Sequence, residues 1–326
     1  MRIAARTAVC VVLSLGWAAP ASSAPPGWPA SLTIGTASPG GVYLPYGQAL
    51  APILTEALGI PVTAQATQGP DQNILLMESG DAAVGFVTMG VALQAWNGTG
   101  GWTNGKEMRS MRALFPMYDT PLHVVALKSS GLDSFANMAD KRIGVGPQGG
   151  TAGNYVPSIF KVLGIPVVMR NGAWTLMASQ LRSQQLDVVV GSAGVPLPFI
   201  AELDAAEPLN FIALGDDQIA TIRKAMPELG VSVVPVGTYP SLKADYKTLG
   251  LYNFAVARKD LPDDLVYAIV KAFYANHDRM VAAQPSARES VVANLKRNEF
   301  LPYHPGAVRY YREIGVEVPA DLVPPN

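Results

Sequence analysis

The sequence LTIGTASPGGVYLPYGQALAPILTEALGIPVTAQATQGPDQNILLMES (residues 32–79) decides the fold class, because it alternates short apolar strand-like runs with helical ones. Residues 32–36 and 62–67 are typical of buried strands, and residues 47–58 and 72–79 are typical of helices. Strands that alternate with helices in this way form parallel sheets with right-handed crossovers. We therefore predict an α/β fold.

The same alternation recurs further along the chain. We predict strands over residues 82–88, 142–145, 167–170 and 187–190, and helices over residues 91–96, 151–163 and 173–182. Two successive β-α-β-α-β runs in a chain of 326 residues indicate two lobes. Each lobe is expected to be a mainly parallel sheet flanked by helices.

The C-terminal part is different, because it contains helical patterns without intervening strands. The periodicity predicts helices over residues 263–280 and 286–296, and a last short helix that begins at Pro305. Trailing helices of this kind often pack back onto the first lobe, which would make that lobe discontinuous. We therefore expect lobe 1 to comprise residues 30–123 plus 253–326 and lobe 2 to comprise residues 124–252, with two interlobe crossings near residues 123–126 and 251–256.

The N-terminus has the layout of a secretory signal peptide. Arg2 and Arg6 precede an apolar run of about twelve residues, and small residues follow it. We predict a signal peptide over residues 1–21, with cleavage after Ala21 favoured over cleavage after Ala24, and hence a periplasmic protein. Removing the segment changes the formal charge from −1 to −3 and also removes Cys10, the only cysteine.

Composition excludes several classes of function. About half of the residues are apolar and only 15% are charged, with no run of Lys or Arg, so binding to nucleic acid is not expected. A mature chain without cysteine has no disulfide and no thiolate metal site. His123, His277 and His304 are far apart in the sequence, without the spacing of metal ligands, so we expect no metal site.

Five segments carry a family resemblance. They are LTIGTASPGGVY (32–43), TQGPDQNILLMESG (67–80), RIGVGPQGGT (142–151), RKDLPDDLVY (258–267) and LPYHPGAVRYYRE (301–313). In this order they resemble the TAXI-family solute-binding proteins, which are the extracytoplasmic subunits of one branch of TRAP transporters. The resemblance covers almost all of the predicted mature chain.

The resemblance implies a two-lobed periplasmic-binding-protein fold, similar to type II. It implies a receptor that binds a small carboxylate-containing solute, an amino acid or a dicarboxylate, between the lobes and delivers it to TRAP-type membrane permease subunits. Such a receptor is not an enzyme and needs no cofactor. After cleavage of the signal it would not insert into the membrane.

The first set of candidate site residues lies in lobe 1. The loop that contains Ser38, Gly40 and Gly41 joins a predicted strand to a predicted helix, so its N–H groups and the helix N-terminus can face an anion. We expect Tyr43 to donate a hydrogen bond to the ligand. Gln68 lies in the next such loop, and Asn73 is assigned to the binding cleft by the resemblance.

The second set lies in lobe 2. Residues 144–149 read G-x-G-x-x-G, but the motif lies in the middle of the chain, Pro147 occupies its turn, and no acidic residue ends the following strand, so we reject a dinucleotide site. Instead we interpret the loop as the counterpart of the Ser38 loop. The candidate ligand-binding residues of lobe 2 and the crossings are Gln148, Gly149, Gly150, Thr151, Ser192 and Tyr252.

Two alternatives remain open from the sequence. Similar two-lobed folds also host enzymes and sensory binding proteins. No nucleophile–base pair is visible in the sequence, and a sensor would need a permanent membrane tether, so the receptor is the leading hypothesis.

Overall fold

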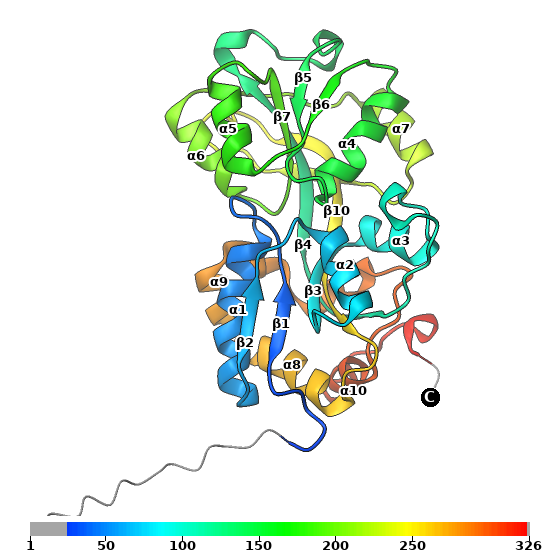
Figure 1. Cartoon of the computed structure of the whole chain (residues 1–326). Coiled ribbons are helices and arrows are strands. Elements are labelled where there is room, and N and C mark those ends of the chain that lie inside the picture. Colours follow the sequence, from blue (N-terminus) through cyan, green and yellow to red (C-terminus); the bar gives the residue numbers. More distant parts are fainter. Residues whose placement is uncertain (1–24, 325–326) are drawn as a thin grey trace, which may run out of the picture.

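The computed structural model describes residues 25–324, which form two lobes placed end to end (Figure 1). The predicted signal peptide, residues 1–21, lies outside the described residues. Within the described range no helix is both long and apolar enough to cross a membrane.

Lobe 1 is built on three parallel strands in the order β2-β1-β3. These strands are β1 (Leu32–Gly35), β2 (Val62–Gln65) and β3 (Val84–Thr88). They alternate with the helices α1 (Tyr43–Leu58), α2 (Pro70–Ser79) and α3 (Met89–Asn97). The predicted α/β alternation is therefore present in this lobe.

Lobe 2 repeats the pattern with shorter strands. Its parallel strands are β5 (Arg142–Gly144), β6 (Val168–Arg170) and β7 (Val188–Ser192), in the order β7-β5-β6. Its helices are α4 (Thr151–Val162), α5 (Trp174–Arg182), α6 (Pro198–Ala206) and α7 (Asp216–Ala225). Two further short strands, β8 (Leu209–Phe211) and β9 (Gly230–Val234), complete its sheet region.

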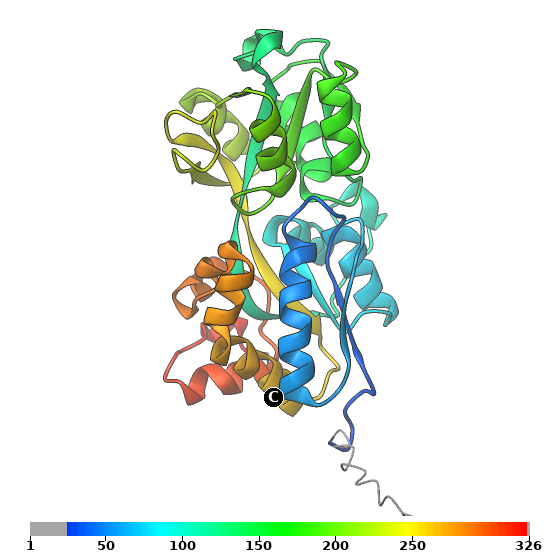
Figure 2. The same cartoon turned by 90° about the vertical axis from the view of Figure 1, so that its left-hand side faces the viewer.

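Two long strands, β4 (Met111–Leu127) and β10 (Tyr246–Arg258), run through both lobes, as Figure 2 shows from the side. They pair antiparallel with each other from Met111 to Pro121 of β4. From Leu122 onward β4 pairs with β7 and β8 instead. β10 pairs with β9 in its first half and with β3 in its second half. The two predicted lobe boundaries lie within these strands.

The first two C-terminal helices pack against α1, and two of the predicted helix bounds in this part of the chain are wrong. Residues 263–280 are not one helix, because α8 (Asp263–Ala275) ends at Asn276 and α9 (His277–Ala283) follows it. The Asn276 side-chain amide donates to the Ala272 carbonyl at 2.9 Å and so competes with the helical hydrogen-bond ladder.

Residues 286–296 also fail to form the predicted α-helix. Two 3₁₀ turns, Pro285–Glu289 and Val292–Arg297, flank the buried Ser290. The Ser290 hydroxyl donates to the Met117 carbonyl of β4 at 2.7 Å and lies 2.9 Å from the hydroxyl of Tyr46. This anchoring fixes the chain where an α-helix would otherwise continue.

Helix α1 begins four residues earlier than predicted, at Tyr43. Pro45 does not prevent this, because N–H groups in the first helical turn have no acceptor within the helix. The early start buries Tyr43 and Tyr46 against Phe86 of β3, with ring centroids 5.6 and 5.4 Å from that ring. The N-terminus of α1 is thereby brought to the junction of the two lobes.

His304 is the cap of the last helix, α10 (Pro305–Glu313). Its ring is fully buried, and Nδ1 accepts a hydrogen bond from the Gly306 N–H at 3.2 Å. Burial lowers the pKa of His304 to about 4, so the ring is neutral at pH 7 and able to accept this bond.

We predict that His304→Ala lowers the free energy of unfolding by about 2–4 kcal/mol, because it removes a helix cap and leaves a cavity in the core. Urea unfolding of the two proteins measures this. His304→Asn keeps a cap acceptor and should recover part of the loss. A His304→Ala protein as stable as the wild type would contradict the capping role.

Candidate functional site

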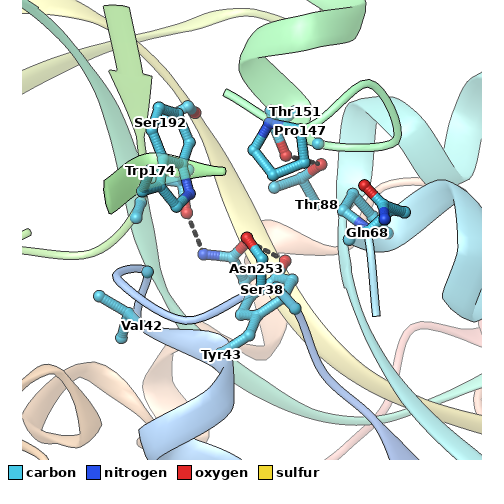
Figure 3. A pocket seen from close by; sticks show the side chains of 17 residues that line it. Ser38, Val42, Tyr43, Gln68, Thr88, Pro147, Thr151, Trp174, Ser192 and Asn253 are labelled. Carbon is cyan, nitrogen blue, oxygen red and sulfur yellow. Dashed lines mark hydrogen bonds between the residues drawn. The ribbon is translucent and has the colours of Figure 1, made fainter. Parts of the chain in front are cut away.

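A cavity of about 40 Å³ lies between the lobes, where loops from both sheets meet. Its walls are the loops that follow the carboxyl ends of the parallel strands, which is where open α/β sheets bind ligands. Figure 3 shows these side chains converging from both lobes. The lining residues are Ala37, Ser38, Gly41, Val42, Tyr43, Gln68, Gly69, Pro70, Thr88, Thr120, Pro147, Gly150, Thr151, Trp174, Ser192, Ala193 and Asn253.

Neutral hydrogen-bond donors dominate the polar part of this lining. The hydroxyl oxygens of Ser38 and Ser192 are buried and have no hydrogen-bond partner among the described residues. Thr88 and Thr151 come from opposite lobes, and their hydroxyls lie 3.1 Å apart. In such a pair one hydroxyl donates to the other, so one O–H remains free to donate elsewhere.

Two helix N-termini from opposite lobes also reach the cavity. No side chain of the described chain caps α1 at Val42 or α4 at Gly150. The first N–H groups of both helices are therefore available to other acceptors. Both helix dipoles also favour negative charge at the helix N-terminus. The electrostatics of the cavity thus favour an anion.

The cavity floor is formed by the two crossing strands. Asn253 of β10 is fully buried, and its Oδ1 accepts from the Tyr43 hydroxyl at 2.6 Å. Its Nδ2 donates to the Tyr118 carbonyl at 2.8 Å and to the Thr120 hydroxyl. Burial raises the pKa of Tyr43 well above its usual value, so the phenol stays protonated. Because the Tyr43 O–H donates to Asn253 in this structure, the expected hydrogen bond from Tyr43 to a ligand would require this internal bond to break.

An aromatic wall closes the side of the cavity that faces α5. Trp174 stacks on Phe199 with centroids 4.6 Å apart, and Gly146 and Gly40 both lie against Trp174. Gly146 has φ +69°, and a Cβ there would come within 2.2 Å of the indole ring. The glycine of the G-x-G-x-x-G motif therefore makes room for Trp174, which gives the motif a packing role.

Seven of the predicted site residues line the cavity and five do not. Those that line it are Ser38, Gly41, Tyr43, Gln68, Gly150, Thr151 and Ser192; those that lie outside its lining are Gly40, Asn73, Gln148, Gly149 and Tyr252. Gly40 and Gly149 lie at the contact between the lobes, where Gly40 accepts from the Phe199 N–H at 3.3 Å.

Asn73 is buried behind the loops and holds them in place. Its Nδ2 donates to the carbonyls of Thr36 at 2.7 Å and Phe86 at 2.8 Å, and its Oδ1 accepts from the Thr67 hydroxyl at 2.8 Å. Both amide protons are used within lobe 1. Asn73 is therefore a positioning residue in this structure, and its loss is expected to affect folding first.

Tyr252 directly precedes Asn253 in β10, and successive side chains of a strand point to opposite faces of the sheet. Tyr252 faces away from the cavity, where its hydroxyl donates to the Glu289 carbonyl at 3.0 Å. Sequence reasoning named Tyr252 as a candidate, whereas in the structure its neighbour Asn253 lines the cavity. It also missed Thr88 and Trp174, although both stand at the ends of predicted elements that face the cleft.

A second contact, between Asp71 and Asn154, joins the lobes beside the cavity. The Asn154 amide donates to the Asp71 carboxylate at 2.6 Å, and the Asp71 N–H reaches the Gly149 carbonyl at 3.4 Å. Burial raises the pKa of Asp71 to about 7, although the bond from Asn154 opposes that shift. A change in the charge of Asp71 is therefore expected to alter this contact between the lobes.

The fold is that of a two-lobed periplasmic binding protein. The structure is similar to the periplasmic binding protein BugD, with a TM-score of 0.53 and 14% sequence identity over 90% of this chain and 99% of that one. It is also similar to a protein of Bordetella bronchiseptica RB50, with a TM-score of 0.50 and 16% identity over 90% of this chain and 91% of that one. The chain belongs to the NMT1-like family, whose model matches residues 34–315.

We predict a pH dependence that originates at Asp71. Because its pKa is higher in the folded protein than the usual 3.8, its contribution to stability is full below pH 4 and is lost as the pH rises through about 7. Asp71→Asn keeps an acceptor for Asn154 and removes the charge. The melting temperature of Asp71→Asn minus that of the wild type should therefore increase by a few degrees between pH 4 and pH 8. Two parallel melting curves across this range would contradict the assignment.

Proposed function

We propose that this protein is a non-catalytic receptor of the periplasm that binds a small carboxylate-containing solute between its lobes. The observation that carries this proposal is the interlobe cavity, whose polar lining consists of neutral donors from both lobes. Hydrogen bonds to a charged group contribute about 1.5–3 kcal/mol each, so a few such donors are enough to hold a carboxylate.

A receptor accounts for the chemistry of the cavity better than an enzyme. A catalytic serine needs an adjacent base to activate it, whereas the hydroxyls of Ser38 and Ser192 have no hydrogen-bond partner among residues 25–324. Tyr43 is the one titratable side chain in the described lining, and its burial keeps it protonated.

We propose that the solute is delivered to a TRAP-type membrane permease. This part rests on the five segments that resemble TAXI-family receptors in order along the chain. The resemblance of the N-terminus to a signal peptide supports export of the protein to the periplasm.

Binding is expected to require a hinge motion, because the cavity has room for roughly three water molecules and both lobes wall it in. The continuous strands β4 and β10 join the lobes, and bending them would open the cleft. X-ray scattering curves of the protein with and without the solute should therefore differ. If the two curves are identical and both correspond to an open cleft, the lobes do not close on the solute.

The binding mode is tested with three variants after a thermal-shift screen has identified a carboxylate ligand. Saturation at 100 times the Kd stabilises the folded state by about 2.7 kcal/mol, which such a screen detects. Ser192→Ala and Thr151→Ala should each raise the Kd at least about tenfold in calorimetric titration, because each removes a donor to the anion. Ser183→Ala, which removes an exposed hydroxyl of the same lobe, is the matched control and should leave the Kd unchanged. Unchanged affinity in both site variants would place the ligand elsewhere.

A further inference from the structure

We infer that the cavity selects short-chain monocarboxylates without an amino group and rejects α-amino acids. This inference rests on the proposed function and is narrower than the amino acid or dicarboxylate that the sequence resemblance implies. Three features of the cavity carry it: the absence of charge in its described lining, the hydrogen bond that the Asn253 amide oxygen already accepts, and the small size of the cavity.

No acidic or basic side chain is present in the described lining of the cavity. Asp71, a buried carboxylate in the first turn of α2, is outside the lining and accepts from Asn154 at 2.6 Å. An α-ammonium group enclosed here would lose its water without gaining a counter-charge. A carboxylate meets the opposite situation, because the helix N-termini of α1 and α4 and the free hydroxyls all favour negative charge.

The amide oxygen of Asn253 at the cavity already accepts one hydrogen bond from within the protein. Asn253 Oδ1 accepts from Tyr43 at 2.6 Å, and the Asn253 amide nitrogen faces the Tyr118 carbonyl and the Thr120 hydroxyl, which fixes the orientation of the amide. The hydroxyls of Ser38 and Ser192 can each donate one proton to an anion. Each of these hydroxyls can also accept a hydrogen bond, but the described lining holds no charged acceptor for an ammonium group.

The dimensions and the remaining walls set the length of the solute. A cavity of about 40 Å³ favours a small solute, such as a carboxylate with a short tail, over one that carries a second carboxylate on a longer chain. Trp174, Val42 and Pro147 supply an apolar surface for that tail. In Figure 3, Trp174 and Pro147 come from lobe 2 and Val42 comes from lobe 1.

The test compares ligands that share one skeleton, using the wild-type mature protein and calorimetric titration. Lactate and alanine differ by a hydroxyl in place of an ammonium, propionate lacks both, and succinate adds a second carboxylate. We expect propionate or lactate to bind, and alanine and succinate to bind at least about 100-fold more weakly. Alanine or succinate binding as tightly as lactate would overturn this inference while leaving the receptor function intact. Failure of every carboxylate and amino acid to bind would instead overturn the proposed function.

A charge variant provides a second test that does not depend on the size of the ligand. Gln68 lines the cavity mouth, so Gln68→Glu introduces a carboxylate beside the solute without changing the shape of the side chain. The ratio of lactate affinity to alanine affinity should fall about threefold to tenfold. Gln185→Glu adds the same charge at an exposed position of lobe 2 and should leave the ratio unchanged. Equal ratios in both variants would contradict the electrostatic basis of the selection.

Discussion

The pairing of β4 with β10 is the constraint on which the rest of the molecule depends. These two strands are long enough to belong to both lobes, and β4 exchanges β10 for β7 as its partner between Pro121 and Leu122. The same strands also supply Thr120 and Asn253 to the cavity. The connection between the lobes and the floor of the cavity are therefore one structure, so any change in hinge geometry moves groups that face the solute.

Close approach of the lobes requires that side chains be absent at particular positions. A Cβ on Gly69, which has φ +133°, would lie 2.7 Å from the Gly149 carbonyl of the other lobe. A Cβ on Gly40 would lie 2.9 Å from Trp174. Glycines in loops that the sequence predicts to face an anion thus permit backbone contact and indole packing between the lobes. The role of each of these glycines therefore depends on which residue of the other lobe packs against it.

The fold and the loops of the site could be predicted because their signals are local. Strand and helix periodicity located the β-α units, and the rule that ligands lie at the carboxyl ends of strands selected the loops that contain Ser38 and Thr151. The break at Ser290 and the choice between Tyr252 and Asn253 could not be predicted. Ser290 bonds to Met117, 173 residues away, and the facing of β10 is set by its register with β4. Both depend on tertiary contacts that no short window of sequence contains.

The titratable group at the contact between the lobes is separate from the groups that line the cavity. Asp71, whose pKa is about 7, lies at the contact between the lobes and bonds to Asn154, whereas the described lining of the cavity is uncharged. Protonation of Asp71 is therefore expected to act at the contact between the lobes, whereas the hydroxyl and N–H groups of the lining would act on the proposed solute. Because neutral donors do not titrate near pH 7, their attraction for a carboxylate is constant across the range in which Asp71 changes charge. A pH-dependent affinity in this protein would therefore arise from the closure of the lobes.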